Sequence, residues 1–181
     1  MQTAPIGRQF MQGGTDMEKN ITIRPERVSD YQQVEDIIRQ AFYNLYTPGC
    51  TEHYLAHAIR PHPDFLPELD LVLELDGRVV GNIMYTKSTL VDEAGKEKGI
   101  LTFGPVCIRP GLQRRGYGRL LMEESFRRAS AMGYEAIVIF GDPNNYVGRG
   151  FQSCKKFRVS AEGGKYPVSY THLRAHETRG N

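Results

Sequence analysis

Three arginines lie beside two closely spaced glycines in the middle of the chain. The segment reads Val106-Cys107-Ile108-Arg109-Pro110-Gly111-Leu112-Gln113-Arg114-Arg115-Gly116-Tyr117-Gly118-Arg119. An apolar run, a glycine turn and an amphipathic stretch are typical of a strand that leads into a helix. The first amides of a helix lack intrahelical partners and carry partial positive charge, and glycine lets a ligand approach the backbone. The segment therefore predicts a site that holds a diphosphate through main-chain N–H groups.

Two common glycine-rich phosphate loops do not fit this segment. A nucleotide-binding P-loop needs Lys and Ser or Thr directly after its last glycine, whereas Tyr117 and Gly118 follow Gly116 here. A dinucleotide fingerprint needs a third glycine where Leu121 stands. Both a Walker-type NTPase and a dinucleotide-binding domain are therefore excluded.

The pattern Gln113-x-x-Gly116-x-Gly118 resembles the acetyl-coenzyme A motif of the GNAT superfamily of N-acetyltransferases. A second block strengthens the resemblance, because Gly141-Asp142-Pro143 leads into Tyr146-x-x-x-Gly150-Phe151, similar to the closing segment of that family. The resemblance covers about residues 20–167. It is nearest to a subset of predicted acetyltransferases of unknown substrate that share the Gly-Asp-Pro sequence.

The resemblance implies that acetyl-CoA is a cosubstrate and that a primary amine attacks its thioester directly in a ternary complex. The amides of residues 114–119 would hold the diphosphate, the three arginines would add charge, and residues 106–108 would offer main-chain groups to the pantetheine arm. The expected cofactor-binding residues are Val106, Cys107, Ile108, Gln113, Arg114, Arg115, Gly116, Tyr117, Gly118 and Arg119. A solvated helix end is the alternative interpretation of the arginines.

Tyr146 matches the family tyrosine that is thought to protonate the departing thiolate, and a phenol is a plausible acid for that step. A tyrosine that only packs remains the alternative. Cys107 could be mistaken for an acyl carrier, although the sequence places no histidine beside it and a small core residue is the favoured interpretation. No general base is identified, and water relayed to Glu68, Asp70, Glu74 or Asp142 stays open, as does attack by an already neutral amine.

The composition gives little support to other kinds of site. His53 and His57 lie one helical turn apart without a third ligand at recognisable spacing, so we expect no metal. The net charge of +2 argues against nucleic-acid binding. Three cysteines without metal spacing, together with the lack of a long apolar run, predict a cytoplasmic protein that does not engage a membrane. The partner is then a small-molecule or peptide amine, and an oligomer is possible.

The resemblance implies an α/β (α+β) fold with a mixed sheet. We expect a mostly antiparallel central sheet with a splayed parallel strand pair and helices on both faces, as in GNAT-like acyltransferases. The expected strands are 21–24, 69–75, 79–85, 100–108 and 136–140, and the expected helices run from the Ser29–Gln32 capping box to Leu45, from Thr51 to Arg60 and from Tyr117 to Met132. Because Pro105 cannot donate to a ladder, its strand should be bulged or unpaired there.

The ends of the chain differ from the central part. Residues 1–19 are polar and glycine-rich, and we predict a disordered leader ahead of a domain over 20–167. Residues 168–181 resemble vector or adaptor readthrough, so we predict a non-native tail in place of the last family strand and a truncated domain. The alternative to an enzyme is therefore a non-catalytic CoA-binding module or an inactive relic.

Overall fold

The computed structural model describes residues 20–161 and 171–175, and the chain divides into two compact units. The first unit contains the described residues up to Met84 together with Pro105–Arg128. The second contains Tyr85–Gly104 and the described residues from Ala129 onward. Strands β3 (Arg78–Val91) and β4 (Glu97–Ile108) run through both units.

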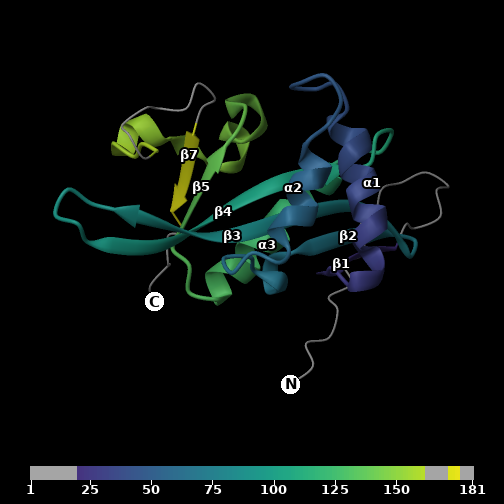
Figure 1. Ribbon diagram of the computed structural model, residues 1–181, viewed down its shortest axis with the longest axis horizontal. Coiled ribbons are helices and arrows are strands. Elements are labelled where there is room, and N and C mark those ends of the chain that lie inside the picture. The colour runs from purple at the N-terminus through teal and green to yellow at the C-terminus, as the bar shows by residue number, and fades with distance from the viewer. Residues whose placement is uncertain (1–19, 162–170, 176–181) are drawn as a thin grey trace, which may run out of the picture. The chain divides into compact units, whose positions relative to one another are not determined.

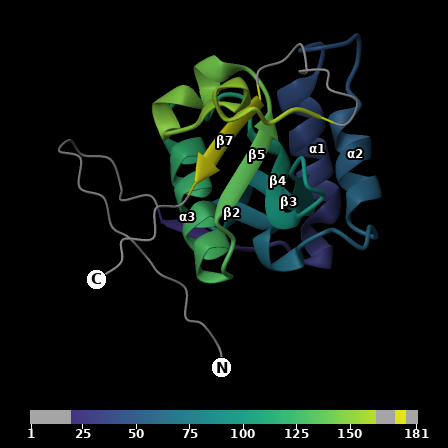
Figure 2. The same cartoon turned by 90° about the vertical axis from the view of Figure 1, so that its left-hand side faces the viewer.

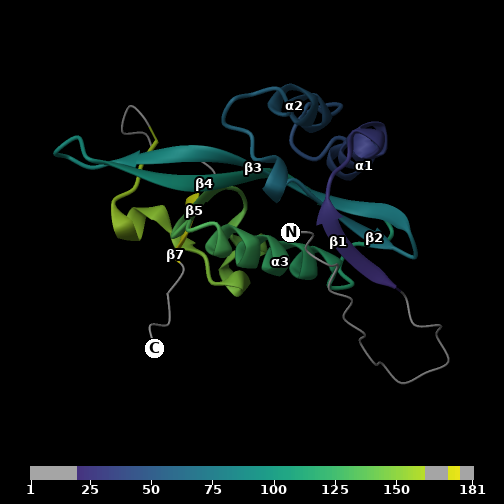
Figure 3. The same ribbon diagram turned by 90° about the horizontal axis from the view of Figure 1, so that it is seen from below.

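The first unit consists of strands covered by helices on two sides. Its further elements are β1 (Ile21–Pro25), η1 (Val28–Asp30), α1 (Tyr31–Phe42), α2 (Glu52–Ile59), η2 (Pro67–Leu69), β2 (Leu71–Leu75) and most of α3 (Tyr117–Ala131). The strands follow the order β1-β2-β3-β4, and the β1–β2 and β2–β3 pairs are antiparallel. Helices α1 and α2 lie on one face and α3 on the other (Figures 1 and 3). The prediction of helices on both faces is confirmed.

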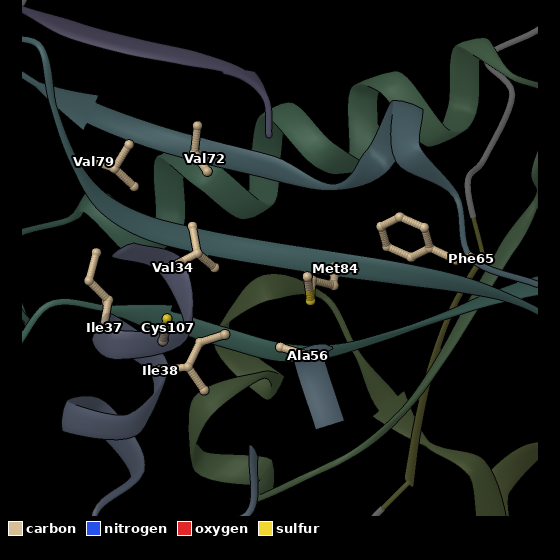
Figure 4. Close-up of a cluster of buried hydrophobic side chains, with 9 residues drawn as sticks. All are labelled: Val34, Ile37, Ile38, Ala56, Phe65, Val72, Val79, Met84 and Cys107. Carbon is tan, nitrogen blue, oxygen red and sulfur yellow. The ribbon is translucent and has the colours of Figure 1, made fainter. Parts of the chain in front are cut away.

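The core of the first unit lies beneath α1 and α2. Periodic apolar residues of α1 meet alternating apolar residues of the strands, as the spacing of buried positions in helices and half-buried strands requires. The cluster comprises Val34, Ile37, Ile38, Ala56, Phe65, Val72, Val79, Met84 and Cys107 (Figure 4). On β3, a Cβ at Gly81 would lie 2.5 Å from Cδ1 of Ile108, so glycine lets β4 pack closely there.

The second unit is built on the arms of the β3–β4 hairpin and the C-terminal elements. These are β5 (Ala136–Phe140), η3 (Pro143–Asn145), η4 (Val147–Arg149), β6 (Gln152–Ser153), η5 (Cys154–Phe157) and β7 (Thr171–Ala175). Strands β4 and β5 pair in parallel through Leu101 and Ile137, which confirms that the sheet contains a parallel strand pair. Gly104 adopts a φ of 152°, and this departure from extended backbone fits the irregularity expected at Pro105.

The prediction that the last family strand is missing was wrong. Residues 171–175 form β7, which pairs antiparallel with all five residues of β5 and with Gln152 and Ser153 of β6 (Figure 2). Pairing with strands on both sides satisfies main-chain groups whatever the side chains are, so the low apolar content of this stretch did not prevent strand formation. The proposed origin of residues 168–181 stays a prediction, and the expected leader lies outside the described residues.

Three helix boundaries also differ from the prediction. Helix α1 ends at Phe42 rather than Leu45, because Tyr43 leaves the helical region and Asn44 adopts a φ of 55°. The predicted Ser29–Gln32 capping box was wrong, since the Asp30 carboxylate accepts the Arg27 amide at 2.8 Å instead. Helix α3 ends at Ala131 rather than Met132, and Met132 is exposed.

Residues with positive φ occur at two turns of the fold. Asp76 and Gly77 both adopt positive φ, as a tight hairpin such as β2–β3 requires, and Gly133 with a φ of 90° follows the end of α3. No helix in the described ranges is long and apolar enough to cross a membrane.

Candidate active site

The predicted cofactor-binding segment, residues 106–119, is called the cradle. It lies in the first unit and joins the end of β4 to the start of α3. The Arg109 amide donates to the Val80 carbonyl at 2.7 Å, which fixes the end of the strand. The chain then turns through positive φ at Gly111, Arg114 and Gly116. Gln113 braces this turn, because its side-chain Nε2 donates to the Ile108 carbonyl at 3.1 Å. Gln113 thus fixes the loop to the end of β4, the strand that precedes it.

The start of α3 leaves main-chain donors available. The Leu120 amide donates to the Gly116 carbonyl at 3.1 Å, which is the bond that closes the first turn of a helix. The amides of Tyr117, Gly118 and Arg119 precede that bond and have no carbonyl four residues earlier within the helix. Their partial positive charge is directed out of the helix N-terminus, and this arrangement suits a phosphate oxygen.

The backbone requires glycine at only one of the two motif positions, 116 and 118. Gly116 adopts a φ of 88°, which strains any residue with a Cβ, although a Cβ there would meet nothing within 4 Å. Gly118 has no such φ, and an added Cβ would only touch Cγ1 of Ile108 at 3.6 Å, an ordinary contact. Gly116 is therefore required by the backbone, whereas the fold itself would accept alanine at position 118.

The arginines beside the cradle are exposed but differ in their partners. The Arg119 Nε donates to Glu123 Oε1 at 2.7 Å, and this bond raises the pKa of Arg119. Arg114 and Arg115 have no ion pair among the residues that the structure describes. The guanidinium groups of Arg114 and Arg115 are thus available to an anionic ligand. The guanidinium of Arg119 must first release the Glu123 carboxylate.

The remaining cradle residues are held in the core of the first unit. Tyr117 is buried, and so are Cys107 and Ile108 at the end of β4, while Val106 is half-buried. Burial raises the pKa of the Cys107 thiol to about 12, so this group stays protonated and is no nucleophile at neutral pH. The interpretation of Cys107 as a core residue is supported.

Tyr146 belongs to an aromatic cluster in the second unit. Its ring centroid lies 5.9 Å from that of Phe103 and 5.9 Å from that of Phe151, and Phe103 lies 5.4 Å from Tyr85. Such tilted pairs fix a ring in place. The Tyr146 carbonyl also accepts the Arg149 amide at 2.9 Å, which anchors the start of η4.

Gly141 is a site-supporting residue that the sequence reasoning did not assign. A Cβ at position 141 would lie 2.7 Å from Cε2 of Tyr146, so only glycine leaves room for the ring. Asp142 supports the same turn, because its Oδ1 accepts the Asn144 amide at 2.9 Å. The Gly-Asp-Pro sequence therefore positions Tyr146, and the motif spacing was the available signal for this role.

The open general-base candidates have different environments. Glu68 and Asp142 are exposed, and Glu74 accepts both Nε and Nη2 of Arg24. Asp70 alone is almost completely buried, at 3% exposure. No group of three or more His, Cys, Asp or Glu side chains suited to a metal occurs within residues 20–161 or 171–175. None of these carboxylates is assigned as a base.

The strand that ends in an amide-lined turn and the helix that begins there form, within the first unit, the kind of site that holds an anionic group. Residues 31–152, more than half of the chain, match the acetyltransferase (GNAT) family. The chain belongs to this family of acyltransferases, which confirms the predicted family and fold class.

Relatives of this chain include a curated protein and several solved structures. The uncharacterized N-acetyltransferase YjhQ of Escherichia coli (strain K12) is 26% identical over 88 residues, which are 49% of this chain and 48% of that protein. This chain thus spans about half of the curated relative that it matches.

Two solved structures cover most of the chain. A GNAT family acetyltransferase from Brucella melitensis, in complex with acetyl-CoA, is 26% identical with a TM-score of 0.68, covering 87% of this chain and 88% of that one. The GNAT family N-acetyltransferase YhbS from Escherichia coli, in complex with CoA, is 23% identical with a TM-score of 0.73, covering 90% and 85%. The second likeness shows the fold alone.

Proposed function

We propose that this chain transfers an acetyl group from acetyl-CoA to a primary amine by direct attack in a ternary complex. The observation that carries the proposal is the start of α3, where a positive-φ glycine is followed by amides without intrahelical partners. The acetyl-CoA complex of the Brucella melitensis protein, 26% identical over most of its length, supports the same ligand.

Each part of the cradle has a proposed role toward acetyl-CoA. The amides of residues 114–119 hold the diphosphate, and the guanidinium groups of Arg114, Arg115 and Arg119 add charge that can also serve the 3′-phosphate. The main chain of Val106, Cys107 and Ile108 hydrogen-bonds the pantetheine arm, and the brace from Gln113 keeps the loop in its binding form.

The reaction needs one bond formed and one broken at the thioester carbon. The neutral amine nitrogen attacks that carbon, the tetrahedral intermediate collapses, and the C–S bond breaks to release the thiolate of CoA. Tyr146 donates its phenolic proton to this thiolate and recovers a proton from solvent, while the acetylated nitrogen loses its extra proton to water. Donation by a placed acid is worth about 10²–10⁴ in rate.

The test combines binding and turnover. Calorimetry with acetyl-CoA should give a single saturable site, and thiol release should appear with at least one member of a panel of small-molecule, amino-acid and peptide amines. Binding without release across the panel would support the alternative, a non-catalytic CoA-binding module. Absence of any acetyl-CoA binding would contradict both functions.

Tyr146→Phe tests the acid. The phenyl ring keeps the contacts with Phe103 and Phe151, so we expect kcat to fall at least about 10²-fold while the affinity for acetyl-CoA stays unchanged. An unchanged kcat at saturating substrate would remove Tyr146 from the mechanism without affecting the rest of the proposal.

A further inference from the structure

The side chain of Ile108, the last residue of β4, fills the space between β3 and the start of α3. It is buried within the first unit. On the β3 side, a Cβ built on Gly81 would lie 2.5 Å from Cδ1 of Ile108. On the α3 side, a Cβ built on Gly118 would lie 3.6 Å from Cγ1 of the same side chain. Ile108 therefore lies between a glycine of β3 and a glycine of α3.

Gly81 leaves the space that Ile108 occupies. Gly81 does not adopt positive φ, so the backbone of β3 would accept alanine there and only the surroundings oppose it. Besides meeting Ile108, a Cβ at position 81 would lie 3.0 Å from the Cys107 carbonyl oxygen and 3.6 Å from Cδ2 of Leu121, which is fully buried in α3. A glycine within a strand often marks such a close approach. Gly81 thus sets how closely β4 and α3 pack on β3.

Hydrogen bonds hold the main chain around Ile108 in place. The amide of the next residue, Arg109, donates to the Val80 carbonyl at 2.7 Å, and Val80 lies where β3 shifts its register against β2. The carbonyl of Ile108 itself accepts Nε2 of Gln113 at 3.1 Å. Because these bonds fix the backbone, a group inserted at position 81 would push the Ile108 side chain toward α3.

The two groups that Ile108 separates are those proposed to hold CoA. The main chain of residues 106–108 faces the pantetheine arm in the proposed function, and the amides of Tyr117, Gly118 and Arg119 in the first turn of α3 face the diphosphate. A ligand that contacts both groups binds well only when their separation is already correct in the free protein. The packing of Gly81 against Ile108 therefore bears on affinity as well as on stability.

We propose that Gly81 is a positioning residue for the cofactor. It acts through the Ile108 side chain, which sets the separation between the end of β4 and the first amides of α3. Gly81 itself is assigned no contact with the ligand. This role rests on the proposed binding of CoA, and it adds a residue of β3, outside the glycine motif, to the determinants of that binding.

Gly81→Ala tests this role by calorimetric titration with CoA on folded protein. We expect the Kd to rise at least about tenfold, and the amides of residues 117–119 to shift in the ¹⁵N–¹H spectrum recorded without ligand. The matched control is Gly99→Ala, because nothing lies within 4 Å of a Cβ at this other strand glycine. A Kd in Gly81→Ala within about twofold of the wild type, or a loss that Gly99→Ala shares, would overturn the proposal. Absence of CoA binding by the wild type is a separate result, which would contradict the proposed function and this role with it.

A rescue experiment separates positioning from a general loss of stability. Ile108→Val removes the Cδ1 atom that a methyl group at position 81 would meet, so the double variant G81A/I108V has room for both side chains. We expect it to bind CoA at least about threefold more tightly than G81A, with the amides of residues 117–119 returning toward their positions in I108V. A double variant that binds as weakly as G81A would overturn the proposal. If G81A does not fold, Ile108→Ala removes the separating side chain without adding a group, and unchanged CoA affinity in that variant would overturn the proposal equally.

Discussion

Gly118 offers a test at the residue scale, because the fold does not require it. A Cβ at this position meets only Ile108, and alanine favours helices over glycine by about 0.5–1 kcal/mol. We expect Gly118→Ala to fold with unchanged or higher melting temperature. Under the proposed function it should bind acetyl-CoA at least tenfold more weakly, because the methyl group would restrict the approach of the diphosphate to the backbone.

Gly116→Ala is the matched comparison for Gly118→Ala. Its φ of 88° strains a residue with a Cβ, so we expect stability and acetyl-CoA affinity to fall together. Calorimetric titration and thermal melts measure both quantities. Undiminished affinity in Gly118→Ala would mean that no ligand approaches the backbone there.

Gly141→Ala tests whether the position of Tyr146 matters. The added methyl would lie 2.7 Å from Cε2 of Tyr146, so the ring must move. We expect kcat to fall by about tenfold or more with acetyl-CoA binding retained, since misplacement by about 1 Å is costly in catalysis.

Gly148→Ala provides the control, because nothing lies within 4 Å of a Cβ at that position. Equal kcat values in Gly141→Ala and Gly148→Ala would show that the ring position is irrelevant to turnover. Steady-state thiol release on both proteins makes the comparison.

At the element scale, α3 contains two acidic residues with separate tasks. Glu123 pairs with Arg119 at the cradle, whereas Glu124 accepts hydrogen bonds from Arg127 and Arg128 at 2.8 Å. Neutralising Glu123 should release Arg119 to the ligand. We expect Glu123→Gln to raise acetyl-CoA affinity about two- to fivefold at low salt, with the gain shrinking as salt rises. Calorimetry at two salt concentrations measures this, and Glu124→Gln should show no gain.

Glu124 contributes instead to the acid stability of α3. The hydrogen bond from Arg127, with that from Arg128, lowers the pKa of Glu124 to about 2. A lowered pKa in the folded state gives stability that is complete above the unfolded value near 4.5 and is lost as pH falls toward 2.

Glu124→Gln should therefore be less stable by about 0.5–1 kcal/mol at pH 7 and equal to the wild type near pH 2. Denaturant unfolding at both pH values measures the difference, and Glu123→Gln is the exposed control. A stability difference that persists at pH 2 would assign the effect to packing rather than to charge.

At the scale of the whole molecule, motifs and turns were predictable because they are local. The cradle turn, the Asp76-Gly77 hairpin and the parallel β4–β5 pair follow from positive-φ requirements and strand–helix–strand order. The roles of the glycines could not be predicted, because they depend on the folded surroundings. A Cβ at Gly141 would collide with the Tyr146 ring, whereas the fold would accept a Cβ at Gly118.

Long-range pairing was the least predictable part of the fold. The side chains of residues 171–175 gave no strand pattern, yet β7 forms between β5 and β6 because open main-chain groups are available on both sides. The buried ion pair between Arg60 and Glu26 was equally hidden, since its partners are 34 positions apart in sequence and neither residue stands in a recognisable motif.

The most direct measurement is a two-dimensional ¹⁵N–¹H spectrum of the protein titrated with CoA and, separately, with pantetheine, which lacks the diphosphate. We expect the amides of Gly116, Tyr117, Gly118 and Arg119 to shift strongly with CoA and to stay nearly unchanged with pantetheine. Saturable CoA binding that leaves these four amides unmoved would contradict the diphosphate cradle at the start of α3.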